Sequence, residues 1–294
     1  MNQQTPDSAT PILVIGSSRS GTKWLSNILC NHSEIAGVQA QRHNGILETN
    51  LFDTMQMALG DVSQVENYVA LIELWAQTDF FKAANASKEI FYKCSPRPDS
   101  CLAVFGLLMN TLARENRKCF LLQKMSPRDA PEVLRFFQGC RIVTMRRKMI
   151  PVLESRLQKE RNRGVRLSVA RSAFHYALQA KILSGISRRN GVISVDYDQL
   201  CNDTEGVART ICRELGIEFE SEMLSTGYRR NTSFRSRKRN RFSGRERLVA
   251  RTVAGLTRSL PLPILRWIRE RFRNKQPQFI PGTFAEIIDR YHIK

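Results

Sequence analysis

The chain has 294 residues and a formal net charge of +19 at pH 7. A chain of this length buries about 75% of its unfolded surface, so we expect one large domain with or without an extension. Its seven cysteines contain no C-x-x-C pair, which argues against a disulfide framework or a cysteine-based metal site and indicates reduced thiols. No apolar run reaches the ~18 residues that span a bilayer, and the N-terminus lacks signal-peptide features, so we expect a cytoplasmic protein.

The positive charge is concentrated near the C-terminus. Residues 229–275 contain sixteen Lys or Arg and only two acidic residues, a local balance of +14. A field of this sign attracts polyanions such as phosphorylated ligands, acidic lipids or nucleic acid, but it selects none of them.

Strand and helix patterns alternate along the chain. An apolar, β-branched run over 11–16 predicts a strand that ends in glycine, and helical spacing follows it. Later patterns predict helices over 65–81, 102–115, 131–137, 168–188 and 205–215, and strands over 119–123, 141–145 and 191–195. This alternation predicts a three-layer α/β fold, with a central, mostly parallel sheet and helices on both faces. We expect this domain to span 1–228, with a basic C-terminal extension over 229–294.

The segment GSSRSGTKW, residues 16–24, follows the first strand. A glycine-containing turn between strand and helix presents backbone N–H groups and the positive end of a helix dipole, which suits phosphate or a similar tetrahedral anion. A kinase loop has lysine directly after its second glycine and then a hydroxyl residue, whereas here Thr22 precedes Lys23. A kinase, with Asp196 as a magnesium ligand, is a rival hypothesis, but this residue order disfavours it. A second alternative is an ordinary strand-helix turn that binds no ligand.

This loop resembles the 5′-phosphosulfate loop of sulfotransferases that use 3′-phosphoadenosine 5′-phosphosulfate (PAPS), in which a basic residue precedes S-G-T. Three further segments resemble that family: RIVTMRRKMIPVLES, with an arginine and a serine eight residues apart; VISVDYDQL; and FLLQKMSPRD. In the last of these Gln123 replaces the usual glutamate and Met125 is an insertion, which weakens the match at Lys124. The resemblance spans residues 11–220 and fades beyond them.

The resemblance implies a sulfotransferase with PAPS as its donor and no metal. The residues that would bind the 5′-phosphosulfate are Ser18, Arg19, Ser20, Gly21, Thr22 and Lys23. Arg147 and Ser155 would bind the 3′-phosphate, and Tyr197 would lie near the adenine. Trp24 is a candidate for stacking on the base or, equally, a core residue.

The resemblance also implies which residues carry the chemistry. Sulfuryl transfer has a loose transition state in which positioning and cations supply most of the acceleration. Arg19 stands at the family's catalytic lysine position, and its role would be electrostatic because a guanidinium stays protonated. Lys124 is a further catalytic candidate. His43 and Glu48 are both candidates for the acceptor's base, or are surface residues; the apolar neighbours of Glu48 in the sequence, including Phe52, would raise its pKa.

The basic extension contains two features of interest. In the family a basic loop closes over the 3′-phosphate, and the candidates for this role are Arg237, Lys238, Arg239 and Arg245. Farther on, LPLPILRWIRERFRNK has an apolar helical face with Trp267 at its flank and basic residues elsewhere; that face consists of Ile264, Leu265, Ile268 and Phe272. Such a helix either lies on an anionic membrane or docks on the main domain.

The expected partner is an acceptor with a hydroxyl or an amine: a glycan, a lipid or a small molecule. A peripheral contact with an anionic membrane is compatible with the charge, and we expect no specific nucleic acid. In a third hypothesis the protein binds nucleic acid or a membrane through residues 229–275. This hypothesis explains the charge but not the motifs at the strand ends.

Overall fold

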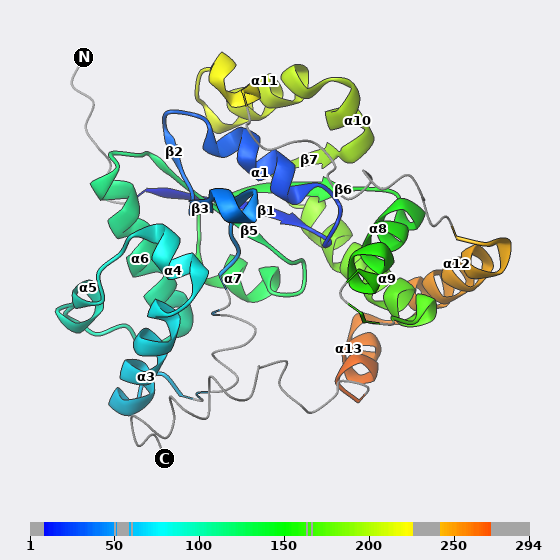
Figure 1. Ribbon diagram of the computed structural model, residues 1–294, viewed down its shortest axis with the longest axis horizontal. Coiled ribbons are helices and arrows are strands. Elements are labelled where there is room, and N and C mark those ends of the chain that lie inside the picture. The colour runs from blue at the N-terminus through cyan, green and yellow to red at the C-terminus, as the bar shows by residue number, and fades with distance from the viewer. Residues whose placement is uncertain are drawn as a thin grey trace.

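The structure is a computed structural model that describes residues 9–49, 51, 59, 61–162, 164–165, 167–225 and 242–271. Five parallel strands form its main sheet, in the order β2-β5-β1-β6-β7 (Figure 1). These strands are β1 (Thr10–Gly16), β2 (Ile35–Ala36), β5 (Phe120–Met125), β6 (Arg141–Arg146) and β7 (Val192–Asp196). A short antiparallel hairpin consists of β3 (Gln39–Ala40) and β4 (Gly45–Ile46), with a 3-10 turn over Gln41–His43 between them.

The sequence of β1 explains its central place. Its run Ile12-Leu13-Val14-Ile15 is at most 1% exposed, so both faces of the strand are covered. A strand buried on both sides has a continuous apolar run rather than an alternating one, as parallel strands between helical layers do. The predicted α/β fold with a parallel sheet is therefore confirmed.

Helices cover both faces of the sheet. Helices α1, α10 and α11 pack on one face and α6, α7 and α9 on the other, which gives three layers (Figure 1). The helices near the sheet are α1 (Thr22–Cys30), α6 (Cys101–Glu115), α7 (Ala130–Phe136), α8 (Met149–Arg161), α9 (Val169–Ser187), α10 (Tyr197–Asn202) and α11 (Thr204–Leu215). The remaining helices are α3 (Val65–Ala76), α4 (Asp79–Ala84), α5 (Glu89–Tyr92), α12 (Gly244–Ser259) and α13 (Leu262–Arg271), with a 3-10 turn over Ser221–Leu224.

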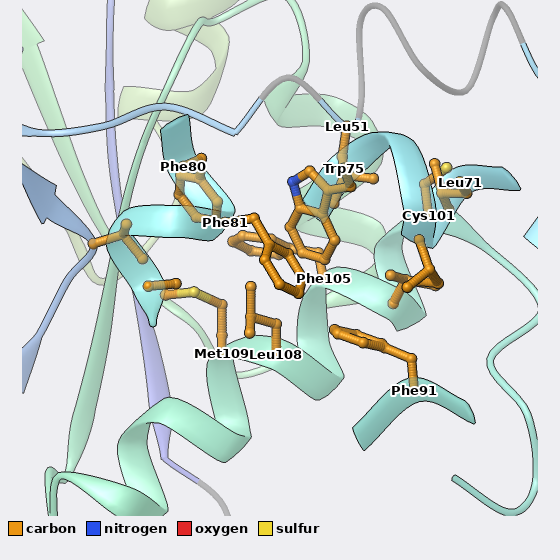
Figure 2. Close-up of a cluster of buried hydrophobic side chains, with 14 of the residues drawn as sticks. Leu51, Leu71, Trp75, Phe80, Phe81, Phe91, Cys101, Phe105, Leu108 and Met109 are labelled. Carbon is orange, nitrogen blue, oxygen red and sulfur yellow. The ribbon is translucent and has the colours of Figure 1, made fainter. Parts of the chain in front are cut away.

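The helical pattern predicted over 65–81 is split into α3 and α4. The helix is interrupted at Thr78, because the Thr78 side chain accepts a hydrogen bond from the Phe81 amide and so caps the start of α4. Both helices contribute to a second core, in which the fully buried Trp75 contacts Phe80, Phe81 and Phe91 (Figure 2). This core fixes α4 beside the β3–β4 hairpin.

The helix α12 packs along α9, although the sequence did not predict it. Its ends are held by polar contacts with the main domain: Phe242 N–H donates to Glu154 Oε1 at 3.0 Å, and Lys181 Nζ donates to the carbonyls of Arg258 and Leu260 at 2.8 and 2.6 Å. Ser243 and Glu246 form a capping box at its start. The expected boundary at 228 lies outside the described residues.

Candidate active site

The parallel register brings the carboxyl ends of four strands into one row. Gly16 of β1 pairs with Met145 of β6, and Arg146 pairs with Asp196 of β7. On the other side of β1, Met125 of β5 lies opposite Ile15. The residues at and just after these ends are Lys124, Arg19, Arg147 and Tyr197, so four of the predicted site residues gather at one edge, where α/β sheets bind their ligands.

The loop between β1 and α1 turns sharply at two residues with positive φ. Arg19 has φ 72° and Gly21 has φ 105°. Gly21 is the N-cap of α1, and among the residues that the structure describes no side chain caps this helix end. The first amides of α1 are therefore available, with the positive end of the helix dipole, to bind an anion. Ser20 is buried with no hydrogen-bond partner for its Oγ among the described residues, whereas Ser18 is exposed and Thr22 buried.

Arg19, Arg147 and Ser155 are in direct contact. Arg19 Nε donates to Ser155 Oγ at 2.9 Å, across 136 residues of sequence, and Arg147 Nη1 donates to the Arg19 carbonyl at 2.9 Å. Burial and the neighbouring Arg147 guanidinium lower the pKa of Arg19. Two guanidinium groups held this close repel each other, so the pair favours an anion of high charge between them.

Tyr197 covers the other side of the loop. The Cζ atom of Arg147 lies 3.8 Å from its ring centroid, and Trp24 meets the ring edge-on at 6.2 Å between centroids. A Cβ atom on Gly21 would lie 2.5 Å from Cδ2 of Tyr197. Gly21 is therefore required both by its backbone conformation and by the close approach of the tyrosine. Trp24 is half-buried, which leaves part of the indole accessible.

A second charged group lies at the end of β5. Lys124 is buried, and its Nζ forms an ion pair with Glu48, whose side chain is 50% exposed. Burial and the proximity of Lys124 lower the pKa of Lys23, and Glu48 acts in the opposite direction. Lys23, Lys124 and Glu48 thus form one cluster. Of the apolar neighbours expected around Glu48, Leu51 is buried and Leu47 half-buried, and Phe52 lies outside the described residues; the Glu48 side chain itself is half exposed and pairs with Lys124.

His43 faces away from this cluster. Its Nε2 lies 2.8 Å from Oδ2 of Asp79, which also pairs with Arg42. What His43 offers to the cluster is its backbone carbonyl, which accepts a hydrogen bond from Lys23 Nζ at 2.7 Å. Sequence reasoning missed Asp79, whose signal was the Thr-Asp pair typical of a helix start.

Asn27, on the buried side of α1, is a positioning residue that sequence reasoning also missed. Its Nδ2 donates to the Asn44 carbonyl at 3.1 Å, and its Oδ1 accepts from the Ile46 amide at 2.9 Å. Gly45 follows with φ 104°, and a Cβ there would lie 2.2 Å from Asn27 Oδ1. The amide therefore holds the hairpin that carries His43 and leads to Glu48.

Replacing Asn27 with leucine should lower the free energy of unfolding by about 1–3 kcal/mol, because the buried Ile46 amide and the partly buried Asn44 carbonyl lose their partner. Urea denaturation measures this change. Asn31→Ala is the matched control: this amide lies at the end of α1, where it makes one hydrogen bond, at 3.3 Å, to the Glu222 carbonyl, and its loss should cost less than ~1 kcal/mol. Equal losses in the two variants would contradict the proposed role of Asn27.

Comparison with known proteins identifies the family to which a chain with this site belongs. Residues 11–221 match the model of the sulfotransferase family. The chain belongs to the sulfotransferase family. It is a PAPS-dependent transferase, as the loop and strand-end motifs predicted.

The solved structures to which this chain is similar include three bacterial-type sulfotransferase structures or domains. The sulfotransferase domain from the curacin biosynthetic pathway is 17% identical, with a TM-score of 0.51 over 97% of this chain and 98% of that one. The sulfotransferase domain of the Synechococcus PCC 7002 olefin synthase is 19% identical, with a TM-score of 0.49 over 94% and 100%. A sulfotransferase from Mycobacterium tuberculosis is 11% identical, with a TM-score of 0.48 over 90% and 77%. No curated protein sequence matches this chain.

Three of the candidate lid residues of this sulfotransferase, Arg237, Lys238 and Arg239, lie outside the described residues. Arg245, the fourth, is exposed in the first turn of α12. Within the described ranges, no helix is long and apolar enough to cross a bilayer.

Proposed function

We propose that this sulfotransferase transfers the sulfuryl group of PAPS to a hydroxyl or amine of its acceptor, with the donor bound along the ends of β1, β6 and β7. The observation that carries this proposal is the direct contact of Arg19 with Ser155 and Arg147. It makes the loop and the predicted 3′-phosphate residues parts of one cationic site, here called the donor pocket, as a donor with a phosphate at one end and a phosphosulfate at the other requires.

The residues of this pocket fit such a donor. The buried Ser20 hydroxyl and the amides that begin α1 suit the phosphosulfate oxygens, with Thr22 and Lys23 beside them. Arg147 and Ser155 suit the 3′-phosphate. Tyr197 and the accessible part of Trp24 offer aromatic surface to the adenine, and stacking of this kind is worth ~1–3 kcal/mol per base.

Arg19 has the central electrostatic role. The donor supplies the sulfuryl group, and negative charge grows on the 5′-phosphate oxygen as its bond to sulfur breaks. Arg19 stabilises that charge and donates no proton, because a guanidinium stays charged at neutral pH. Its present contact with Ser155 holds the guanidinium at the pocket, ready for the bound anion.

We assign the acceptor's base to Glu48 rather than His43. The Glu48 carboxylate is oriented by Lys124 at the end of β5 and lies near Lys23, next to the donor loop. The His43 ring is engaged by Asp79 instead. Glu48 would take the acceptor's proton while the acceptor oxygen or nitrogen bonds to sulfur, and Lys124 would act as its positioning residue.

Ligand-dependent thermal stability tests the donor assignment. We expect adenosine 3′,5′-bisphosphate to raise the unfolding midpoint without added metal, because a ligand of the native state at about 100 Kd adds ~2.7 kcal/mol. ATP with Mg²⁺ and a DNA oligomer are the comparisons. A response confined to ATP with Mg²⁺ would favour a kinase, and one confined to DNA would favour a nucleic-acid-binding protein.

The acceptor is proposed to be a glycan, a lipid or a small metabolite. Transfer of labelled sulfate from PAPS into fractionated cell extracts distinguishes the three, because the label separates with the polysaccharide, organic-solvent or low-mass fraction. If none of the three fractions accepts label and all of it remains in PAPS, the proposed transfer would be contradicted.

A further inference from the structure

The helix α12 buries its small residues and exposes its large ones. The residues that pack toward the domain are Ala250, Ala254 and Thr257, each at most 2% exposed. On the opposite side, Leu248 and Leu256 are 66% and 63% exposed and Val249 is 42% exposed. A helix that only docked on its own domain would place its leucines inward. The inverted pattern indicates that the outer face of α12 binds something else.

The following helix has the same character. Leu265 is fully buried in α13, whereas Trp267 is 65% exposed and Ile264 45% exposed. Of the apolar face expected from the sequence, Leu265 is buried, Ile268 is half-buried and Ile264 is exposed, while Phe272 lies beyond the described residues. Leu265 fixes the helix to the protein, and the large apolar side chains around it remain accessible.

Arginines surround these exposed apolar residues. Residues 244–271 contain seven arginines and two glutamates. Six of the arginines are exposed: Arg245, Arg247, Arg251, Arg258, Arg266 and Arg271. Figure 1 shows α12 and α13 at the periphery, beyond α8 and α9 and on the opposite side of the molecule from α5. The exposed side chains of these two helices, which together we call the α12–α13 face, are thus both cationic and apolar.

We propose that the α12–α13 face binds peripherally to an anionic lipid bilayer. Arginines near an anionic surface are each attracted to the headgroups, while leucine, isoleucine and valine side chains enter the acyl boundary. An indole with one polar edge prefers the depth between these two regions, which suits Trp267. A nucleic acid would use the arginines but leave the exposed leucines and isoleucine in water. A bilayer uses both kinds of residue.

Sedimentation of the full-length chain with vesicles tests this proposal. We expect binding to vesicles of phosphatidylcholine with phosphatidylserine and little binding to phosphatidylcholine alone, with a marked loss between about 0.1 M and about 1 M salt. Tryptophan emission should shift to shorter wavelength on binding. Trp75 is buried in the core, and Trp24 is half-buried on α1, apart from these two helices, so the shift should disappear in Trp267→Gln.

Two variants separate the apolar and cationic contributions. Leu256→Gln with Trp267→Gln should lower the partition coefficient at least about tenfold. Arg251→Gln with Arg266→Gln should lower it roughly 25-fold, at about fivefold for each charge. The matched controls are Val65→Gln, an apolar residue 57% exposed on α3, and Arg114→Gln, an exposed residue on α6, and both should bind like the unmodified chain.

All of the substituted residues are exposed, so folding and bisphosphate binding should be unchanged in every variant. Equal binding to neutral and anionic vesicles, or equal losses in the control variants, would overturn the proposal. So would a concentration-dependent dimer in the absence of lipid that the Leu256 and Trp267 changes abolish, because the face would then bind a second copy of the chain. Tight DNA binding that the Arg251 and Arg266 changes weaken, without vesicle binding, would overturn it as well.

Discussion

Replacing Glu48 with glutamine is expected to lower kcat by about 10²–10⁴-fold, the range that a positioned proton acceptor contributes. Glutamine keeps the size of the side chain but cannot take a proton. The affinity for adenosine 3′,5′-bisphosphate should stay within about twofold, because in the proposed site Glu48 faces the acceptor rather than the donor phosphates. Rapid-quench sulfate transfer measures the first quantity, and calorimetric titration with the bisphosphate measures the second.

His43→Asn is the matched comparison for this variant. Both residues belong to the same segment after α1, but the His43 ring is paired with Asp79. We expect a loss of less than about tenfold in kcat, arising from a shift of the hairpin. A larger loss in His43→Asn than in Glu48→Gln would reverse the assignment of the base. Urea denaturation is needed for both, because Glu48→Gln also leaves the buried Lys124 ammonium without its carboxylate.

The strands and the donor loop could be predicted because their signals are local. Four consecutive apolar residues before Gly16 indicate a strand buried on both faces, and the order Gly21-Thr22-Lys23 distinguishes this loop from a kinase loop. The contact between Arg19 and Ser155 could not be predicted. It joins residues 136 positions apart and depends on the positive φ of Arg19, which aims the side chain across the strand ends.

The errors also have physical causes. The environment of Glu48 was inferred from its neighbours in the sequence, but Leu47 packs partly buried against the core around Trp75, whereas the Glu48 side chain is half exposed and pairs with Lys124. The helix α12 was missed because its buried residues are alanine and threonine, which give little apolar periodicity. Asp79 was missed because a continuous helical pattern concealed the cap at Thr78.

Replacing Arg147 with alanine should weaken the binding of adenosine 3′,5′-bisphosphate by about 2–4 kcal/mol, roughly 30- to 1,000-fold. This side chain connects three parts of the donor pocket: it donates to the Arg19 carbonyl, stacks on Tyr197 and is the proposed ligand of the 3′-phosphate. Arg147→Lys keeps the charge but loses the planar fork, so we expect an affinity between those of the alanine variant and the unmodified protein.

Arg146→Ala provides the control, because this arginine is adjacent in sequence, has the same charge and is exposed at the end of β6. Its removal should change bisphosphate affinity by less than about twofold in moderate salt, where surface charges are screened. Equal effects in the two variants would mean that the overall positive field of the protein attracts the donor. A loss of bisphosphate affinity in Arg147→Ala alone, with no effect of ATP and Mg²⁺ on the unfolding midpoint, requires a specific phosphate contact. In that contact Arg147 binds the 3′-phosphate of the nucleotide, and the loop after β1 binds its 5′ end.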